Sequence, residues 1–295
     1  ARTLYNGGED NLSTEHSYQM IGLIPDCVNT VELTLTDESG EQVGMTAFEV
    51  TAPALSSGVE VQLDKQTASE QTALSDGLFV SLGADGSSAA YSYALLYDND
   101  GFIRGEIPLD DYRPDRLNFD GESLIIPAAE DQIVWIDRTG RVEQVVSIDG
   151  YSMHHDLITQ EDGSLLVLAS KESKDTEEDI ILEVNKDGSV TELLDLETLF
   201  PEYVEACTTD SDKLDWFHAN AITLAGDDSI ILSAREPSTL VKIDNLHTDP
   251  SVSYLIGDQS IWDGFSYAEL LLEKEGDFIS QGGQHSVTYQ ESDAL

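Results

Sequence analysis

The chain has 295 residues, which is enough to bury a large core. Its 14 basic and 58 acidic side chains give a net charge of −44. Because this charge repels phosphates and anionic lipids, neither nucleic acid nor a membrane surface is an expected partner.

Residues 1–66 predict a small β-sandwich domain. Residues 29–63 alternate with period two around a DESGE turn, a pattern typical of antiparallel strands. The segment DKQTASEQT marks the change to a second domain, expected over residues 67–295. We also expect a processed or trimmed N-terminus, because the opening ARTLYNGG has no features of a signal peptide.

Short hairpins dominate residues 67–295. Each joins an apolar strand to a second strand through a Gly-containing turn, which is the signature of antiparallel hairpins. The clearest examples are residues 94–107, 133–146 and 181–194. Pairs of hairpins predict four-stranded units at residues 77–107, 120–147, 154–194 and 218–257.

A four-stranded unit that recurs about every 40–65 residues favours a β-propeller, whose blades surround a channel. The sequence therefore predicts an all-β fold in which roughly four blades and the first strand of a fifth follow the sandwich. We expect the chain to be part of a longer protein, since an unpaired edge strand would otherwise end it. A β-sandwich with coincidental hairpins is the alternative.

Histidines open three successive inner strands of the predicted propeller. Alignment of Ile158 with Ile222 places His154 over His218, 64 residues later, and His285 follows after another 67. The innermost strands of a propeller line its channel, and their first residues lie at one rim. The three imidazoles are therefore expected to converge there, the alternative being that each histidine has a structural role.

The neighbours of these histidines are assigned by strand geometry. Side chains two positions apart share a face of a strand, so Asp156 and Asn220 are expected to point with His154 and His218. His155 is expected to face the blade interior, unless a bulge reverses its direction.

Arg235 follows the small residues Ser233 and Ala234 and is one of few cations in the chain. Its guanidinium presents a planar fork that suits an oxoanion, and a surface ion pair is the alternative. Clustered histidines and a carboxylate also suit a metal, but a nearby Arg favours an anion, so no metal ligand is predicted. The distant Cys27 and Cys207 do not form a zinc motif and leave one disulfide open.

Four motifs carry a family resemblance. HHD, DWFHANAI, ILSAREPSTLVKI and GQHSVTY, in this order, resemble those of the bacterial arylsulfate sulfotransferases that use no nucleotide sulfate donor. The resemblance spans roughly residues 20–289. That family is a six-bladed β-propeller with a small N-terminal β-sandwich domain, so the resemblance implies that the propeller is incomplete in this chain.

The resemblance also implies roles for individual residues. His285 is the histidine that is transiently sulfurylated, while His218 and Arg235 bind sulfate. HHD supplies a further histidine, for which the alignment favours His154. A neutral His285 would attack the sulfur of an aryl sulfate, and a phenol acceptor would reverse the step, giving ping-pong transfer. The weaker candidates for substrate binding are His155, Asn220, Trp216 and Tyr151, with Phe217 and Tyr289 beside them.

The partners that the resemblance implies are a small aryl sulfate donor and a phenolic acceptor, with no cofactor. It further implies export to the periplasm or the extracellular space, and a homodimer is left open. No segment approaches the roughly 20 apolar residues that span a bilayer. Two alternatives remain: a non-enzymatic propeller that binds proteins or glycans, and a metal-dependent lyase or hydrolase that uses the same histidines.

Overall fold

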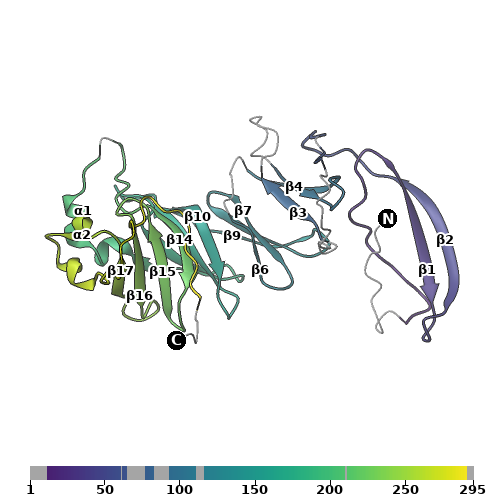
Figure 1. Cartoon of the computed structure of the whole chain (residues 1–295). Helices are drawn as coiled ribbons and strands as arrows, with labels where there is room; N and C mark the ends of the chain where they lie inside the picture. The colour runs from purple at the N-terminus through teal and green to yellow at the C-terminus, as the bar shows by residue number, and fades with distance from the viewer. Residues whose placement is uncertain are drawn as a thin grey trace. The chain divides into compact units, whose positions relative to one another are not determined.

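The computed structural model describes residues 12–60, 62–64, 77–82, 93–110, 116–209 and 211–290 (Figure 1). The chain divides into two compact units, Ala1–Arg113 and Pro114–Leu295. The predicted domain boundary between residues 66 and 67 lies outside the described residues and stays a prediction.

The first unit contains a long two-stranded hairpin of β1 (Val28–Thr36) and β2 (Gln42–Thr51). The expected DESGE turn joins them. The Asp37 carboxylate accepts hydrogen bonds from the amides of Ser39 and Glu41, and this local capping fixes the turn. Within residues 12–60 and 62–64 no second sheet is found, so the N-terminal sandwich also stays a prediction.

A three-stranded antiparallel sheet completes the described part of the first unit. It comprises β3 (Phe79–Leu82), β4 (Tyr93–Tyr97) and β5 (Ile103–Pro108). In the turn between β4 and β5, the buried carboxylate of Asp98 accepts from the amides of Asp100 and Phe102 and from Arg104 Nε. The predicted hairpin at residues 94–107 is therefore confirmed.

The second unit holds three four-stranded antiparallel sheets, each with its strands in sequence order. The first sheet is β6 (Asn118–Phe119), β7 (Leu124–Ala129), β8 (Gln132–Ile136) and β9 (Val142–Ser147). The second is β10 (Tyr151–Thr159), β11 (Leu165–Lys171), β12 (Ile180–Val184) and β13 (Val190–Asp195). The third is β14 (Ala219–Leu224), β15 (Ser229–Ala234), β16 (Thr239–Asp244) and β17 (Ser251–Ile256).

These three sheets confirm the predicted all-β fold and the four-stranded units at residues 120–147, 154–194 and 218–257. The predicted unit at residues 77–107 has three strands among the described residues, so its four-stranded form stays a prediction. Local turn chemistry explains the regularity of the sheets: between β10 and β11, Asp162 accepts from the amide of Ser164, and Gly163 adopts a φ of 88°, a conformation that glycine reaches without steric cost. A closed propeller ring is not seen in the described part of the chain.

Short helices flank the third sheet. They are η3 (Leu196–Thr198), α1 (Pro201–Ala206), α2 (Gln259–Trp262) and η4 (Ser266–Leu270). None of the described helices has the length and apolar character required to traverse a membrane.

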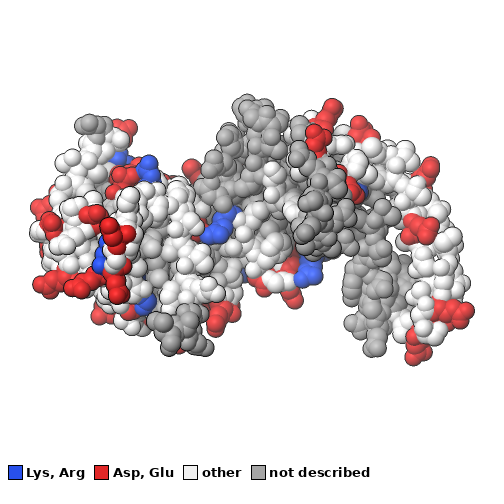
Figure 2. Space-filling model, viewed as in Figure 1, with Lys and Arg blue, Asp and Glu red and all other residues white. Residues whose placement is uncertain are grey.

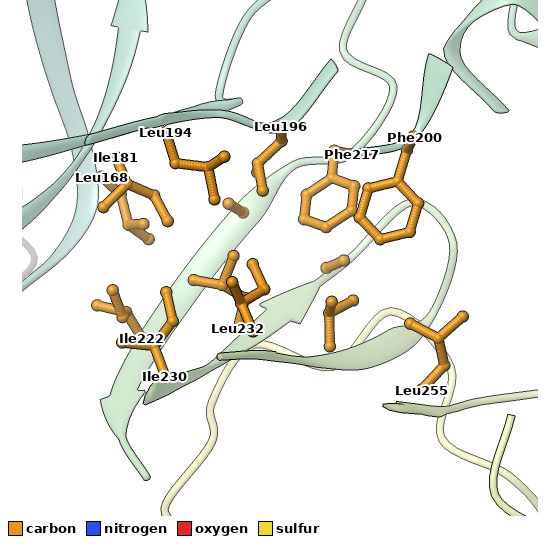
Figure 3. Close-up of a cluster of buried hydrophobic side chains, with 14 of the residues drawn as sticks. Leu168, Ile181, Leu194, Leu196, Phe200, Phe217, Ile222, Ile230, Leu232 and Leu255 are labelled. Carbon is orange, nitrogen blue, oxygen red and sulfur yellow. The ribbon is translucent and has the colours of Figure 1, made fainter. Parts of the chain in front are cut away.

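The main core lies between the second and third sheets (Figure 3). Leu168 and Ile181 of the second sheet belong to the same buried cluster as Ile222 and Leu232 of the third. Burial of one such aliphatic side chain contributes about 1.5–3 kcal/mol. Aromatic side chains extend this core toward the helices: Phe200, Trp216, Phe217, Trp262 and Tyr267.

A second core cluster joins the first and second sheets. Ile133 and Trp135 of β8 pack in it with Leu165 and Val167 of β11. Successive sheets of this unit therefore bury their faces against each other, as neighbouring blades do. This packing brings β10 and β14 into contact, with His155 in the middle of β10 close to His218 just before β14, and so positions the site described below.

The surface is acidic, as the composition requires. On the face shown in Figure 2, Asp and Glu side chains are widely scattered, whereas Lys and Arg are sparse. An anionic ligand therefore meets a repulsive exterior and needs a local concentration of positive charge in order to bind.

His247 links the second and third sheets through two carboxylates. Its Nδ1 lies 2.6 Å from Asp228 Oδ1, and its Nε2 lies 3.0 Å from Glu183 Oε2. The hydrogen bond to Asp228 raises the pKa of His247 above its ordinary value, and that to Glu183 adds to the effect. A raised folded-state pKa stabilises the fold fully below the unfolded value of about 6.5, and this contribution is lost as the pH rises through the folded value.

We therefore predict that His247→Gln lowers the melting temperature most below about pH 6, where the bridging imidazolium is fully charged. The difference from the wild type should shrink at alkaline pH. Thermal unfolding measured across the pH range checks this, with His16→Gln, a change at an exposed histidine, as the control. A difference that grows with pH would contradict the assignment.

Candidate functional site

Three histidines from distant parts of the sequence meet in the second unit. The Nε2 atoms of His155 and His218 lie 3.1 Å apart. The rings of His155 and His285 contact edge to face, with centroids 4.8 Å apart. One ring nitrogen of each histidine lies within 4.8 Å of those of the other two. We call His155, His218 and His285 the histidine cluster.

The backbone at this site is unusual. His155, Glu178 and His218 have φ angles of 53°, 58° and 52°, in the left-handed region that residues other than glycine rarely adopt. The pairing of β10 with β11 is interrupted between Met153 and Leu157, which marks a bulge around His155. Such conformations cost on the order of 1–3 kcal/mol each and are common at functional sites, where the surrounding structure holds them.

The bulge decides which histidine of the HHD motif faces His218. His155 does so: the bulge that was left open as the exception is present, and the side chain of His155 contacts His218 instead of facing the blade interior. His154 lies beside the cluster, with its ring edge to face with that of His155 at 5.5 Å. Its ring nitrogens are buried, and this burial lowers the pKa of His154 to about 4, which keeps the ring neutral.

Two carboxylates adjoin His218. Its Nδ1 lies 2.6 Å from Asp215 Oδ2 and 2.9 Å from Glu178 Oε2. Burial opposes a charge on the ring, but the hydrogen bond to Asp215 and the close Glu178 carboxylate outweigh it and raise the pKa of His218 to about 9. Burial likewise opposes the charge of Glu178, whereas the nearby rings of His155 and His218 hold its pKa well below the usual range. At neutral pH, His218 is therefore an imidazolium.

His285 is exposed and is positioned by the residue before it. The Gln284 carbonyl accepts a 2.8 Å hydrogen bond from Asn220 Nδ2, and Gln284 Nε2 donates to the carbonyls of Ala234 and Thr239 at 2.8 and 3.2 Å. These bonds hold residues 283–285 against the third sheet. The buried Asn220 thus bonds to the segment that carries His285.

Arg235 is attached to the site through its backbone. Its amide donates to the carbonyl of His218 at 3.1 Å. Its guanidinium is 47% exposed and pairs with the carboxylate of Glu236. The structure therefore brings the main chain of Arg235 to His218, but the guanidinium does not contact the histidine cluster in this conformation.

The aromatic candidates have structural partners. Trp216 is 1% exposed, and its Nε1 donates to the buried Asp179 at 3.1 Å. Tyr151 donates its hydroxyl to Glu192, with Lys171 above its ring. Phe217 is part of the main core, and Tyr289 is exposed. These contacts explain Trp216, Tyr151 and Phe217 without a ligand.

We predict that Trp216→Phe lowers the free energy of unfolding and leaves substrate affinity unchanged. The ring contacts remain, but the buried Asp179 carboxylate loses a donor, which costs about 1–3 kcal/mol. Urea unfolding measures the first quantity, and KM for an aryl sulfate measures the second. A raised KM with unchanged stability would instead assign Trp216 to substrate binding.

Sequence patterns did not identify the carboxylates. Asp215 precedes His218 by three residues in the DWFHANAI motif, and that spacing was its only local signal. Glu178 lies in a different sheet connection and has none. It reaches His218 because the segments around Thr176 and Leu214 form a parallel bridge.

The site therefore combines one imidazolium, a buried neutral imidazole and two further histidines. A cationic Nε2–H at His218 suits a negatively charged oxygen. The exposed imidazole of His285 is suited to act as a nucleophile. Together they fit the transfer of an anionic group through a covalent intermediate.

Comparison with known proteins identifies relatives of the chain. Residues 62–295 match the family described as Arylsulfotransferase (ASST). No curated protein matches the chain. Among solved structures, a Bacteroides caccae protein of unknown function is 17% identical, with a TM-score of 0.39 over 59% of this chain and 55% of its own. Virginiamycin B lyase from Staphylococcus aureus is 12% identical, with a TM-score of 0.38, and the match covers 76% of this chain and 73% of the lyase chain.

Proposed function

The chain belongs to the arylsulfotransferase family, a family of enzymes, and from this premise we propose that it transfers a sulfuryl group from an aryl sulfate to a phenol. The proposed route is ping-pong, through a sulfohistidine at His285. The observation that carries the proposal is the meeting of His155, His218 and His285 beside a pair of carboxylates.

The first half-reaction cleaves the donor. A ring nitrogen of neutral His285 attacks the sulfur, an N–S bond forms, and the S–O bond to the aryl group breaks. The electron pair of that bond goes to the phenolic oxygen, which takes a proton from Nε2 of the His218 imidazolium. An unperturbed phenol has a pKa of about 10, so this proton makes the leaving group competent.

The second half-reaction regenerates the enzyme. The acceptor phenol gives its proton back to His218 while its oxygen attacks the sulfur of the sulfohistidine. The N–S bond breaks, and its electron pair returns to the ring of His285. No other reactant is consumed, so the sulfuryl group and the proton balance over the cycle.

Arg235 has a proposed role that requires a rotation. The sulfuryl oxygens carry negative charge in the transition state, and a guanidinium stabilises such charge strongly in a water-poor site. The amide of Arg235 donates a hydrogen bond to the carbonyl of His218, and the half-exposed side chain of Arg235 pairs with Glu236. Rotation of that side chain toward the bound donor would exchange one carboxylate partner for a sulfuryl group.

The direct test is a donor–acceptor assay with 4-nitrophenyl sulfate and phenol. We expect release of 4-nitrophenol that depends on phenol and yields phenyl sulfate, unchanged by a metal chelator. Release of neither product would favour the non-enzymatic alternative. Activity that is lost on chelation and restored by a divalent metal would favour the metal-dependent alternative.

A further inference from the structure

The three clustered histidines differ in their charged partners. His218 places Nδ1 against Asp215 at 2.6 Å and Glu178 at 2.9 Å. His155 lies 3.4 Å from Glu178 through Nε2, the nitrogen that also faces His218. In the ranges that the structure describes, no carboxylate forms an ion pair with His285. Among these three described rings, only His218 therefore has two carboxylates against it, and one of them, Glu178, also lies against His155.

Hydrogen bonds to the second and third sheets hold the segment that carries Glu178. Glu178 donates its amide to Ser170 Oγ and accepts from the amide of Ala219 at the start of β14. Residues 175–177 and Leu214 exchange backbone hydrogen bonds of 2.8 and 3.1 Å. The two carboxylates therefore belong to one bridged pair of connections, and Glu178 keeps its left-handed φ of 58° there.

We propose that Asp215 and Glu178 are positioning residues that fix His218 as the sulfuryl-binding cation and proton donor, an inference that rests on the proposed function. Asp215 accepts a hydrogen bond from Nδ1–H at 2.6 Å, and Glu178 Oε2 lies 2.9 Å from the same nitrogen, so the ring presents Nε2–H to the cluster. In the free enzyme this hydrogen faces His155 Nε2 at 3.1 Å. A donor sulfuryl oxygen or the leaving oxygen would replace His155 as its acceptor.

The same geometry divides the chemical roles. The nucleophile must be neutral in order to attack, whereas the proton donor must be charged. His218 has two carboxylates beside it, whereas among the described residues none forms an ion pair with His285. This difference favours a charged His218 as the proton donor and His285 as the nucleophile. His285 is then free to attack while His218 holds the proton.

The charged and titratable groups that face His218 support this assignment. They come from β10, from the connection between β11 and β12, from the segment before β14 and from the C-terminal segment: His154, His155, Glu177, Glu178, Asp215 and His285. Burial opposes protonation, yet the carboxylates outweigh it and hold the pKa of His218 at about 9. His154 stays neutral because it is buried, so it does not compete for the proton.

The test measures the proton on His218 directly. Nitrogen NMR of ¹⁵N-histidine-labelled protein reports the charge and tautomer of each ring, with His218→Asn used for assignment. In Asp215→Asn and in Glu178→Gln we expect the titration of His218 to move to lower pH by about 1–3 units, the effect of losing an opposite charge at close range. Asp212→Asn is the matched control, since it makes the same change at an exposed position of the same loop.

Kinetics complete the test. The rate of 4-nitrophenol release in a single turnover should fall as the pH rises through the pKa of His218. In Asp215→Asn and Glu178→Gln this fall in rate should occur at lower pH, whereas in Asp212→Asn it should occur at the same pH as in the wild type. An equal loss of rate at every pH, with an unmoved NMR titration, would overturn the inference. Because the NMR titration needs no turnover, a shifted titration in a protein without sulfotransferase activity would refute the proposed function alone.

Discussion

Replacement of His285 by asparagine is expected to abolish both donor cleavage and sulfuryl transfer. The amide of asparagine occupies similar space but cannot form the N–S bond, so the covalent route is closed. Fold stability should change little, because residue 285 is exposed and the neighbouring Gln284 keeps its hydrogen bonds to the third sheet. Release of 4-nitrophenol in steady state and in a single turnover measures the loss.

A second histidine gives the matched control for this variant. His247→Asn makes the same chemical change in the same unit, away from the cluster, and should keep its activity at temperatures where it stays folded. Rapid turnover by the His285→Asn protein would contradict the role assigned to His285.

Loss of the Arg235 guanidinium is the second large effect that we expect. Arg235→Ala should lower kcat/KM for donor cleavage by about 10²–10³, the effect of removing one strong donor to a developing negative charge. Sulfurylation of His285 should still occur slowly, because the nucleophile remains. Arg235→Lys should recover part of the rate, since an ammonium supplies charge without the planar fork.

Glu236 provides the control for the rotation of Arg235. Glu236→Gln removes the carboxylate that pairs with Arg235 in the free structure. We expect this variant to retain activity and to lower KM for the donor, because the guanidinium no longer exchanges an ion pair for the ligand. An Arg235→Ala protein with wild-type kinetics would refute the anion-binding role.

The fold was predictable where local chemistry fixes it. Asp-Gly turns such as that at Asp162 and Gly163 cap themselves through adjacent amides, and alternating apolar residues then determine the strand faces. The alignment of Ile158 with Ile222 was wrong by one residue: counted from the turns, Leu157 with its partner Val167 is equivalent to Ile222 with its partner Leu232.

The site was predictable only in part, because side-chain direction depends on irregular backbone. The equivalent paired residues Leu157 and Ile222 are 65 residues apart, whereas the two histidines that meet, His155 and His218, are 63 apart, because the pairing of β10 and of β14 is irregular beside them. A shift of one residue turns a side chain to the opposite face of a strand. The alignment therefore selected His154.

Long-range contacts account for what the sequence did not reveal. Glu178 reaches His218 through a bridge between two connections, and Trp216 is explained by its bond to Asp179. The orientation of the Arg235 guanidinium depends on its neighbour Glu236. None of these contacts follows from periodicity, because each depends on which loops the packed sheets bring together.

The most direct test of the central proposal is mass spectrometry of protein that is mixed with an aryl sulfate in the absence of an acceptor and then quenched. We predict one added sulfuryl group on the peptide that contains GGQHSVTY, located at His285, and its loss when phenol is added. A sulfuryl group on His218, or unmodified protein that nevertheless turns over donor and acceptor, would contradict the proposal.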